Sequence, residues 1–401
     1  MNDRDIFSQY RVVLLSNPAP IPLMAMVIAV NTRFLLNDHL EGYGYFIQET
    51  FKRITAKYPE HQFIFIFDRP YDERFVFGPN VKAIVTGPQA RHPLLWKYWY
   101  DIKIPAILRK YKADVFVSCD GFCSIRTKVP QCLVVHDLAF LHYPFFNKRS
   151  HVSFLKRNTP KFLKKAAVIA TVSEFSKKDI LDNYKIEADK IDIVFSAAKK
   201  IFHPLSDDVK RTIKEKYTDG KEYFVYAGAI HPRKNLLNLL KAFSVFKKRM
   251  QTNRKLVLAG RLAWKYESFT EDLKRYKYRD DVVMTGYISE EELAKIIGSA
   301  YGLIYPSLFE GFGVPVLEAM QCNVPVITSK NSSMQEIAKD AALYADPEDH
   351  ADISEKMMLL YKDEELGKDL IEKGKEIAKD YSWDRTAELL WKSILRIRNK
   401  E

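Results

Sequence analysis

The sequence predicts an α/β protein of two domains, each built on a parallel sheet with helices on both faces. Short, continuously apolar runs alternate with helical segments along most of the chain, a pattern typical of buried parallel strands. About a dozen such runs are present, too many for one ordinary sheet. The length of 401 residues also corresponds to two or three domains at about 150 residues each.

The expected strands divide into two sets. The first set lies at residues 26–30, 63–67, 82–85, 115–118, 132–135, 168–171 and 191–194. The second set lies at residues 224–227, 255–258, 282–285, 302–305 and 325–328. Segments with helical character separate the runs, so both sheets are expected to be doubly wound.

A break in the apolar pattern at residues 196–207 marks the domain boundary, and a charged helix is expected from Asp207. On each side of the break, a buried strand leads through glycines into an amphipathic helix, which predicts two similar, Rossmann-like halves. We therefore expect a first domain at residues 25–200 and a second at 201–382. Residues 383–401 are expected to form an amphipathic helix that packs back on the first domain, and residues 1–24 to be an appended extension.

The composition limits the class of protein. Hydrophobic residues make up 47% and charged residues 28%, and 63 Lys and Arg against 51 Asp and Glu give a net charge of +12, which suggests an anionic partner. Four cysteines in 401 residues exclude a disulfide scaffold, and their lack of paired spacing argues against a zinc site. Three prolines interrupt the uncharged stretch near the N-terminus, so no transmembrane helix is expected. A cytoplasmic chain with reduced thiols fits these features best.

Residues 305–328 carry the most informative pattern. A strand is followed by a loop with Glu310, Gly311 and Gly313, then by Pro315, which suits the first position of a helix. Glu318 is expected in the first helical turn. Two carboxylates near backbone amides and a helix N-terminus can hold hydroxyl groups beside a bound anion. The alternative is one solvated Glu and one that merely complements the helix dipole.

Residues 228–235 form a second candidate segment, GAIHPRKN, between a strand and a helix. Gly228 opens the turn, and the adjacent Arg233 and Lys234 offer a guanidinium fork and a point charge for a diphosphate. The spacing is neither that of a phosphate-binding P-loop nor GxGxxG, so ATP and nicotinamide chemistry lose their usual support. A basic helix start on the surface is the alternative.

Two further candidates lie in the first half. His136 and Asp137 end an apolar strand, which is where α/β folds place ligands, although a lone His is more often structural. Gly42-Tyr43-Gly44 is expected to be a glycine turn that brings backbone amides close to a ligand.

Together these segments resemble the retaining glycosyltransferases of family 4, which have the two-domain GT-B architecture. The E-x7-E motif of that family is met by Glu310 and Glu318 within FEGFGVPVLEAM. GAIHPRKNLLNLLKAF is similar to the phosphate-binding start of the family's second domain, and three other stretches match in the expected order, VVHDLAFLHYP, TVSEFSKKDI and VVMTGYISEEEL. The resemblance extends from Ala25 to the last helix.

The resemblance implies a role for each matching residue. Arg233 and Lys234 would neutralise the donor diphosphate and Glu318 would bind the ribose hydroxyls. Glu310 would hold hydroxyls of the donor sugar, together with the backbone amides of Phe312, Gly313 and Val314. His136 would contact the transferred sugar. Gly42 to Gly44 would lie near the phosphates or acceptor, and Gly286 and Tyr287 would frame the nucleobase.

The chain departs from the family pattern at two points. Many members have Arg directly after the glycine of the second-domain loop, where this chain has Ala229, so we assign that role to Arg233. The usual Ala-Cys-Gly after the second glutamate reads Gln321-Cys322-Asn323. Because two cations already face the leaving group, no metal and no other cofactor are expected.

The resemblance leaves the substrate open. Similarity to mannosyltransferases of surface-polysaccharide assembly favours GDP-mannose as donor only mildly over a UDP-sugar, with a glycan or polyprenol-linked acceptor. A catalytically silent sugar-nucleotide binder and a nucleic-acid binder are the remote alternatives, and no nucleic-acid-binding motif is present.

A membrane surface is a further candidate partner. Between Lys148 and Lys178 there are nine basic residues against one acid, and an aromatic run precedes them at residues 140–146. Basic residues near an anionic bilayer contribute about 1 kcal/mol each, so peripheral attachment to the inner face of the cytoplasmic membrane is one interpretation. The other is a solvated basic helix whose Phe154, Leu155, Phe162 and Leu163 pack inward.

Overall fold

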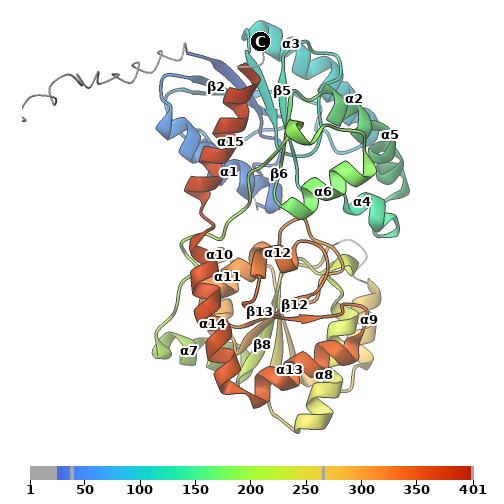
Figure 1. Ribbon diagram of the computed structural model, residues 1–401, viewed down its shortest axis with the longest axis vertical. Coiled ribbons are helices and arrows are strands. Elements are labelled where there is room, and N and C mark those ends of the chain that lie inside the picture. The colour runs from blue at the N-terminus through green and yellow to red at the C-terminus, as the bar shows by residue number, and fades with distance from the viewer. Residues whose placement is uncertain (1–24, 37–39, 264–266, 399–401) are drawn as a thin grey trace, which may run out of the picture.

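The structure is a computed structural model that describes residues 25–36, 40–263 and 267–398. Two α/β domains lie one above the other along the long axis of the molecule (Figure 1). The expected N-terminal extension, residues 1–24, lies outside the described residues. Within these ranges, no helix combines the length and the apolar character that crossing a membrane requires.

The first domain contains a seven-stranded, fully parallel sheet with the order β3-β2-β1-β4-β5-β6-β7. Its strands are β1 (Val27–Asn31), β2 (Gln62–Phe67), β3 (Val81–Val85), β4 (Val115–Ser118), β5 (Gln131–Val135), β6 (Val168–Thr171) and β7 (Ile191–Ile193). Its α-helices are α1 (Gly42–Lys57), α2 (Pro93–Tyr98), α3 (Ile104–Lys110), α4 (Ala139–His142), α5 (Arg149–Lys165) and α6 (Glu174–Asn183).

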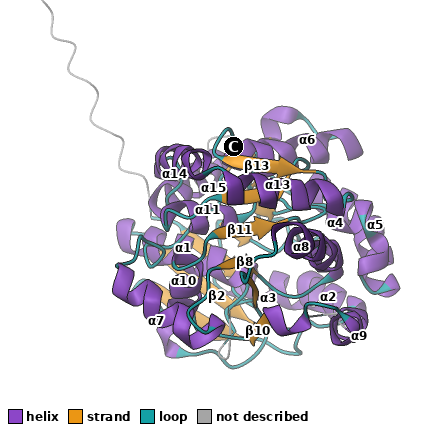
Figure 2. Cartoon of the chain, turned by 90° about the horizontal axis from the view of Figure 1, so that it is seen from below, coloured by secondary structure: helices purple, strands orange, loops and turns teal. Residues whose placement is uncertain are grey.

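The second domain contains a six-stranded parallel sheet with the order β10-β9-β8-β11-β12-β13. Its strands are β8 (Tyr223–Ala227), β9 (Lys255–Ala259), β10 (Val282–Gly286), β11 (Gly302–Tyr305), β12 (Val326–Ser329) and β13 (Ala342–Ala345). Helices lie on both sides of the strands (Figure 2). They are α7 (Asp207–Thr218), α8 (Leu236–Met250), α9 (Glu267–Arg275), α10 (Glu290–Gly298), α11 (Val314–Gln321), α12 (Met334–Ala338), α13 (His350–Lys362) and α14 (Glu364–Lys379).

The strand order places a topological switch point in each domain. In the first sheet the order reverses between β1 and β4, and in the second between β8 and β11. In open parallel sheets, ligands bind outside the carboxyl ends of the strands at such a reversal. The segments that follow β8 and β11 are the two candidate segments of the second half of the sequence.

The chain passes between the domains twice. The first connection is residues 194–206, and the second joins α14 to α15 (Trp383–Arg398). The two connections touch, because the rings of Phe195 and Tyr381 pack edge to face with centroids 5.6 Å apart. Beyond the second connection, α15 lies against α1 of the first domain, where Trp391 stacks on Tyr58 at 4.2 Å (Figure 1).

Candidate active site

The loop between β11 and α11 is shaped by one glycine and one proline. Gly313 has a φ of 102°, a left-handed conformation that favours glycine, and it directly precedes α11. Pro315 lies in the first turn, where a missing N–H costs nothing. The helix begins at Val314, so Glu318 is its fifth residue; the expectation that Glu318 lies in the first turn is wrong by one residue. Glu310 remains in the loop, as expected.

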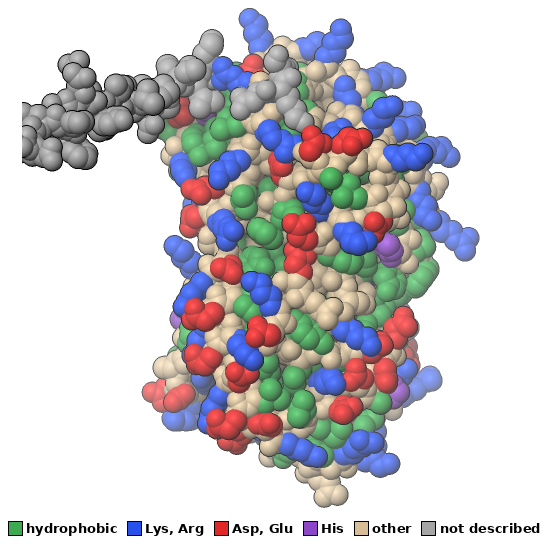
Figure 3. Space-filling model, viewed as in Figure 1, with side chains coloured by type: hydrophobic (Ala, Val, Ile, Leu, Met, Phe, Trp, Pro, Cys, Tyr) green, Lys and Arg blue, Asp and Glu red, His purple; other side chains and the backbone are tan. Residues whose placement is uncertain are grey.

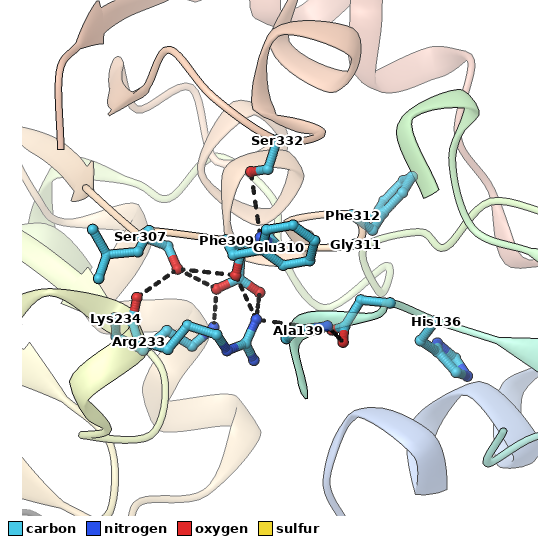
Figure 4. A network of polar contacts seen from close by, with 12 residues as sticks. His136, Ala139, Arg233, Lys234, Ser307, Phe309, Glu310, Gly311, Phe312 and Ser332 are labelled. Carbon is cyan, nitrogen blue, oxygen red and sulfur yellow. Dashed lines mark hydrogen bonds and ion pairs between the residues drawn. The ribbon is translucent and has the colours of Figure 1, made fainter. Parts of the chain in front are cut away.

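Glu310 lies against the two cations of the second candidate segment (Figure 4). One carboxylate oxygen is 2.5 Å from the Lys234 Nζ atom, and the other is 3.2 Å from the Arg233 guanidinium. Ser307 donates a hydrogen bond of 2.5 Å to Glu310, and Lys234 also donates to the Tyr305 hydroxyl. Sequence reasoning found the three charged residues but neither of these two hydroxyls.

The charges of this cluster perturb one another. Burial alone would raise the pKa of Glu310, but the Arg233 and Lys234 charges outweigh it and hold that pKa at about 2. Burial lowers the pKa of Lys234, and the Glu310 carboxylate opposes this effect. The N–H groups of the two cations can form charge-assisted hydrogen bonds with a phosphate group.

The loop that carries the cations is fixed by local contacts. Pro232–Lys234 form one turn of 3₁₀ helix, and the His231 ring nitrogen accepts a hydrogen bond from the Arg233 amide. Asn235 follows with a φ of 64° and donates to the Pro306 carbonyl, which ties this loop to the loop after β11. Gly228 has a φ of 139°, so a residue with a side chain would be strained there.

His136 of the first domain lies on the other side of Gly311 from this cluster, with its ring pointing away from Glu310 (Figure 4). Its Nε2 atom lies 3.0 Å from the Cys119 carbonyl, which can only accept, so Nε2 carries the proton. Burial lowers the pKa of His136 to about 4, which makes the ring neutral near pH 7 and leaves Nδ1 as an acceptor. The neighbouring Asp137 carboxylate is 3.8 Å from the Arg233 guanidinium, an ion pair that joins the two domains.

The prediction of a glycine turn at Gly42-Tyr43-Gly44 is wrong. These residues form the first turn of α1, because the amphipathic helix starts at the first glycine. A Cβ atom at Gly44 would lie 2.5 Å from the Phe34 carbonyl, so glycine permits a close approach of backbone there. The turn is nevertheless next to the site, because the Tyr43 ring contacts the His136 ring with centroids 4.8 Å apart.

The remaining donor-site candidates surround Tyr45 of α1. Burial and the negative charge of Glu290 raise the pKa of Glu318 to about 8. Burial also raises the pKa of Tyr45, as do a hydrogen bond to Glu290 and the nearby Tyr287 and Glu318. Gly286 ends β10 with a φ of 67°, and Tyr287 after it is 60% exposed. Tyr287 and Glu318 therefore lie in one neighbourhood beside α1.

Among the residues that the structure describes, no group of three or more His, Cys, Asp or Glu side chains is arranged to hold a metal ion. The groups that the described residues bring to this region are two cations, a carboxylate, a neutral imidazole and backbone amides.

Comparison with protein families gives two adjoining matches. The family described as Glycosyltransferase Family 4 matches residues 55–196, and the family described as Glycosyl transferases group 1 matches residues 209–377. Together they cover most of both domains.

Two curated bacterial proteins are similar over most of their length. The O-antigen chain mannosyltransferase B of Escherichia coli is 30% identical over 278 residues, which are 69% of this chain and 73% of that protein. The O-antigen chain mannosyltransferase RfbU of Salmonella typhimurium is 28% identical over 277 residues, 68% of this chain and 72% of that protein.

Solved structures share the fold at low sequence identity. Sucrose-phosphate synthase from Thermosynechococcus elongatus has a TM-score of 0.77 at 16% identity, covering 94% of this chain and all of that one (100%). HepE of Anabaena in complex with UDP-glucose has a TM-score of 0.74 at 12% identity, with coverages of 92% and 100%. These likenesses confirm the predicted GT-B architecture.

Proposed function

The chain belongs to glycosyltransferase family 4, the group 1 glycosyl transferases, and from this premise we propose that it transfers mannose from GDP-mannose to a glycan or polyprenol-linked acceptor in surface-polysaccharide assembly. The observation that carries the proposal is the cluster of Arg233, Lys234 and Glu310 at the strand-order reversal of the second domain.

The proposed chemistry follows from the charges that develop during transfer. Breaking a sugar–diphosphate bond places negative charge on the leaving phosphate and positive charge on the anomeric carbon. Fixed cations aimed at the leaving group stabilise this transition state, and such electrostatic contributions are usually the largest. In our proposal Arg233 and Lys234 stabilise the leaving diphosphate, so the reaction requires no metal ion.

Glu310 then has two roles in the proposal. Its carboxylate holds the two cations in place and accepts hydrogen bonds from donor-sugar hydroxyls, with the amides of Phe312, Gly313 and Val314 beside it. Glu318 binds the ribose hydroxyls, and Gly286 and Tyr287 frame the nucleobase. His136 offers Nδ1 to a hydroxyl of the transferred sugar, because its Nε2 proton is already donated to Cys119.

We further propose that transfer retains the anomeric configuration, by a same-face attack that the leaving phosphate guides. Family membership supports this course. The acceptor hydroxyl would then lose its proton to the departing phosphate oxygen, and no side-chain nucleophile is required. Nuclear magnetic resonance of the first product formed from α-linked GDP-mannose would show an α-linkage. A β-linked product would refute retention.

Donor choice is tested by binding and by turnover. Purified full-length chain is screened by thermal shift against GDP-mannose, UDP-glucose and UDP-galactose, and each stabilising compound is then followed for slow hydrolysis without acceptor. We expect the largest shift and detectable hydrolysis with GDP-mannose. A larger shift in melting temperature with a UDP-sugar would show that the donor is that UDP-sugar and not GDP-mannose. Binding without hydrolysis or transfer would support the non-catalytic alternative.

The acceptor side of the proposal includes an anionic membrane surface. A groove of about 660 Å³ lies between α5 and the preceding aromatic segment, and its lining includes Phe145, Arg149, Lys156 and Arg157. Phe145 is 61% exposed. Lys and Arg side chains project from this edge of the first domain (Figure 3). Cations beside an exposed aromatic ring suit the phosphate and acyl regions of a lipid layer.

Flotation with vesicles tests this attachment. Binding should require anionic lipid and weaken with salt, since the Debye length falls to about 3 Å at 1 M. Charge reversal of Arg149, Lys156 and Arg157 should weaken binding, and additional reversal of Lys161, Lys164 and Lys165 on the same helix should weaken it further. Equal recovery with neutral and anionic vesicles would refute the attachment.

A further inference from the structure

The loop that carries Glu310 belongs to the second domain, but side chains of the first domain enclose it. Phe309, only 6% exposed, stacks on the His142 ring with centroids 4.9 Å apart. The Phe175 ring packs edge to face on Phe309 at 5.4 Å, and the Tyr143 ring is 6.1 Å away. Three aromatic rings of one domain thus surround a ring of the other.

Hydroxyl groups of the first domain hold the backbone of the same loop. Ser173 donates a 2.6 Å hydrogen bond to the Gly311 carbonyl, and Ser176 donates to the same oxygen at 3.3 Å. Tyr143 donates to the Leu308 carbonyl at 3.3 Å. Both ends of the loop are therefore fixed by bonds that exist only when the domains are together.

Gly311 is required by the approach of the other domain. A Cβ atom at this position would lie 2.0 Å from the His136 carbonyl oxygen and 3.0 Å from the Asp137 side chain. Its φ lies outside the left-handed region, so its backbone accepts any residue, unlike Gly313 with a φ of 102°. Glycine at 311 serves contact between the domains, whereas glycine at 313 serves the turn into α11.

A carboxylate of the second domain completes the contact. Glu336 of α12 accepts hydrogen bonds from the backbone amides of Glu174 at 2.8 Å and Phe175 at 2.9 Å. These are first-turn amides of α6, which have no partner within their own helix. Ser173 caps the same helix end from within the first domain. The start of α6 is thus satisfied jointly by both domains.

We propose that Ser173, Gly311 and Glu336 are positioning residues for glycosyl transfer, through which the docked arrangement of the two domains holds Glu310 beside Arg233, Lys234 and His136. The inference rests on the proposed function of Glu310. Ser173 holds the carbonyl of the residue next to Glu310, so separation of the domains releases the backbone that aims this carboxylate. Glu336 acts at a greater distance, by stabilising the docked arrangement.

The variants Ser173→Ala, Gly311→Ala and Glu336→Gln test the proposal in the full chain. Asp363→Ala is the matched control, because Asp363 caps α14 within the second domain by an equivalent hydrogen bond to the Leu366 amide at 2.9 Å. Amide hydrogen exchange of residues 172–178 reports docking without any donor. Turnover with GDP-mannose and the dissociation constant of GDP report the reaction.

We expect residues 172–178 to be protected in the unmodified chain and in the control. Gly311→Ala and Glu336→Gln, which change only the second domain, should each speed exchange there on the order of tenfold, as for a lost helix cap. All three variants should lower kcat about 10- to 100-fold, because small misplacements of reacting groups cost that much. The GDP dissociation constant should change less than about threefold.

Three results would overturn the proposal. Exchange and kcat equal to those of Asp363→Ala would show that the first domain does not position the loop. Faster exchange with unchanged kcat would show that docking is unnecessary for transfer. A fall in kcat matched by an equal loss of GDP affinity would place these residues within the donor site. If the unmodified chain transfers no sugar from any donor, the proposed function fails, and the exchange data still decide the docking.

Discussion

Glu310→Gln isolates the charge of the carboxylate on which the site is built. The substitution keeps the size of the side chain but leaves Arg233 and Lys234 facing each other without the anion between them. Both ion pairs are largely buried, since the Glu310 side chain is 10% exposed, the Lys234 side chain 14% and the Arg233 side chain 22%. Removing one partner of a buried pair is strongly destabilising, because the other charge is left uncompensated.

The magnitude follows from the pKa of Glu310, which falls from 4.5 to about 2 in the folded chain. At 1.36 kcal/mol per pKa unit, this difference corresponds to about 3 kcal/mol of stabilisation by the ionised form. Because the folded-state pKa is the lower one, the stabilisation is fully present above about pH 4.5 and is lost as the pH falls towards 2. The neutral amide cannot supply it.

Urea unfolding of both chains at several pH values measures this contribution. The free energy of unfolding of Glu310→Gln should be about 3 kcal/mol lower at pH 7, and the difference should shrink below about pH 4.5. Sugar transfer, measured where both chains are folded, should fall on the order of 10²- to 10³-fold. Glu388→Gln is the matched control, because Glu388 pairs with Lys57 at the same 2.5 Å but both side chains are at least half exposed.

Two results would refute this reasoning. If Glu310→Gln is as stable as Glu388→Gln at pH 7, the ion pairs with Arg233 and Lys234 do not stabilise the folded chain. If the difference from the unmodified chain stays constant down to pH 3, the stability effect comes from packing rather than from the charge. Full transfer activity of Glu310→Gln would remove the carboxylate from the catalytic machinery.

Three further predictions concern the same crevice. Lys234→Ala should lower transfer on the order of 10²-fold while circular dichroism shows an intact fold, and full activity would exclude Lys234. Transfer should survive EDTA, and strict dependence on Mg²⁺ or Mn²⁺ would refute the charge assignment. Glu318→Gln should weaken donor binding and raise the melting temperature, by more at pH 8 than at pH 5. The pKa of Glu318 is about 8 in the folded chain and near 4.5 in the unfolded chain. Keeping the buried carboxyl protonated therefore costs stability that grows with pH between these values, and the neutral Gln side chain avoids this cost.

The strands were predictable because parallel sheets bury both faces. The segment at 63–67, for example, is entirely apolar and entirely buried in β2. The strand that was missed, β13, is ALYA, four residues at the sheet edge with two of them only partly buried. Such a short, weakly β-forming run gives no periodic pattern to detect.

The charged residues of the cluster could be picked out from the sequence, but their pairing could not. Glu310, Arg233 and Lys234 stand out because they lie close to glycines in the segments that follow apolar strands. Their mutual contacts join positions 76 and 77 residues apart, a separation over which local patterns carry no information. The prediction of a turn at Gly42–Gly44 was wrong because it relied too heavily on a local signal. Glycine is a weak guide to backbone conformation where an amphipathic helix begins at it.

Contacts between the domains left no local signal. Ser173 begins α6 as an ordinary helix cap, and Glu336 is an unremarkable acid in the first turn of α12. Gly311 falls within a glycine-containing loop, where a turn explains it equally well until its φ and its distance to the His136 carbonyl are known. Only the packed arrangement of the domains distinguishes these residues from their neighbours.

The double passage of the chain between the domains determines how they can separate. A body tied to another by a single tether can swivel about it in any direction, whereas two adjacent tethers permit bending about the line that joins them and resist torsion. Residues 194–206 and the connection from α14 to α15 are such a pair, and they touch at Phe195 and Tyr381. Any separation of the two domains is therefore expected to be a bending about this pair of connections, which would move the loop that carries Glu310 away from the first domain along a single arc.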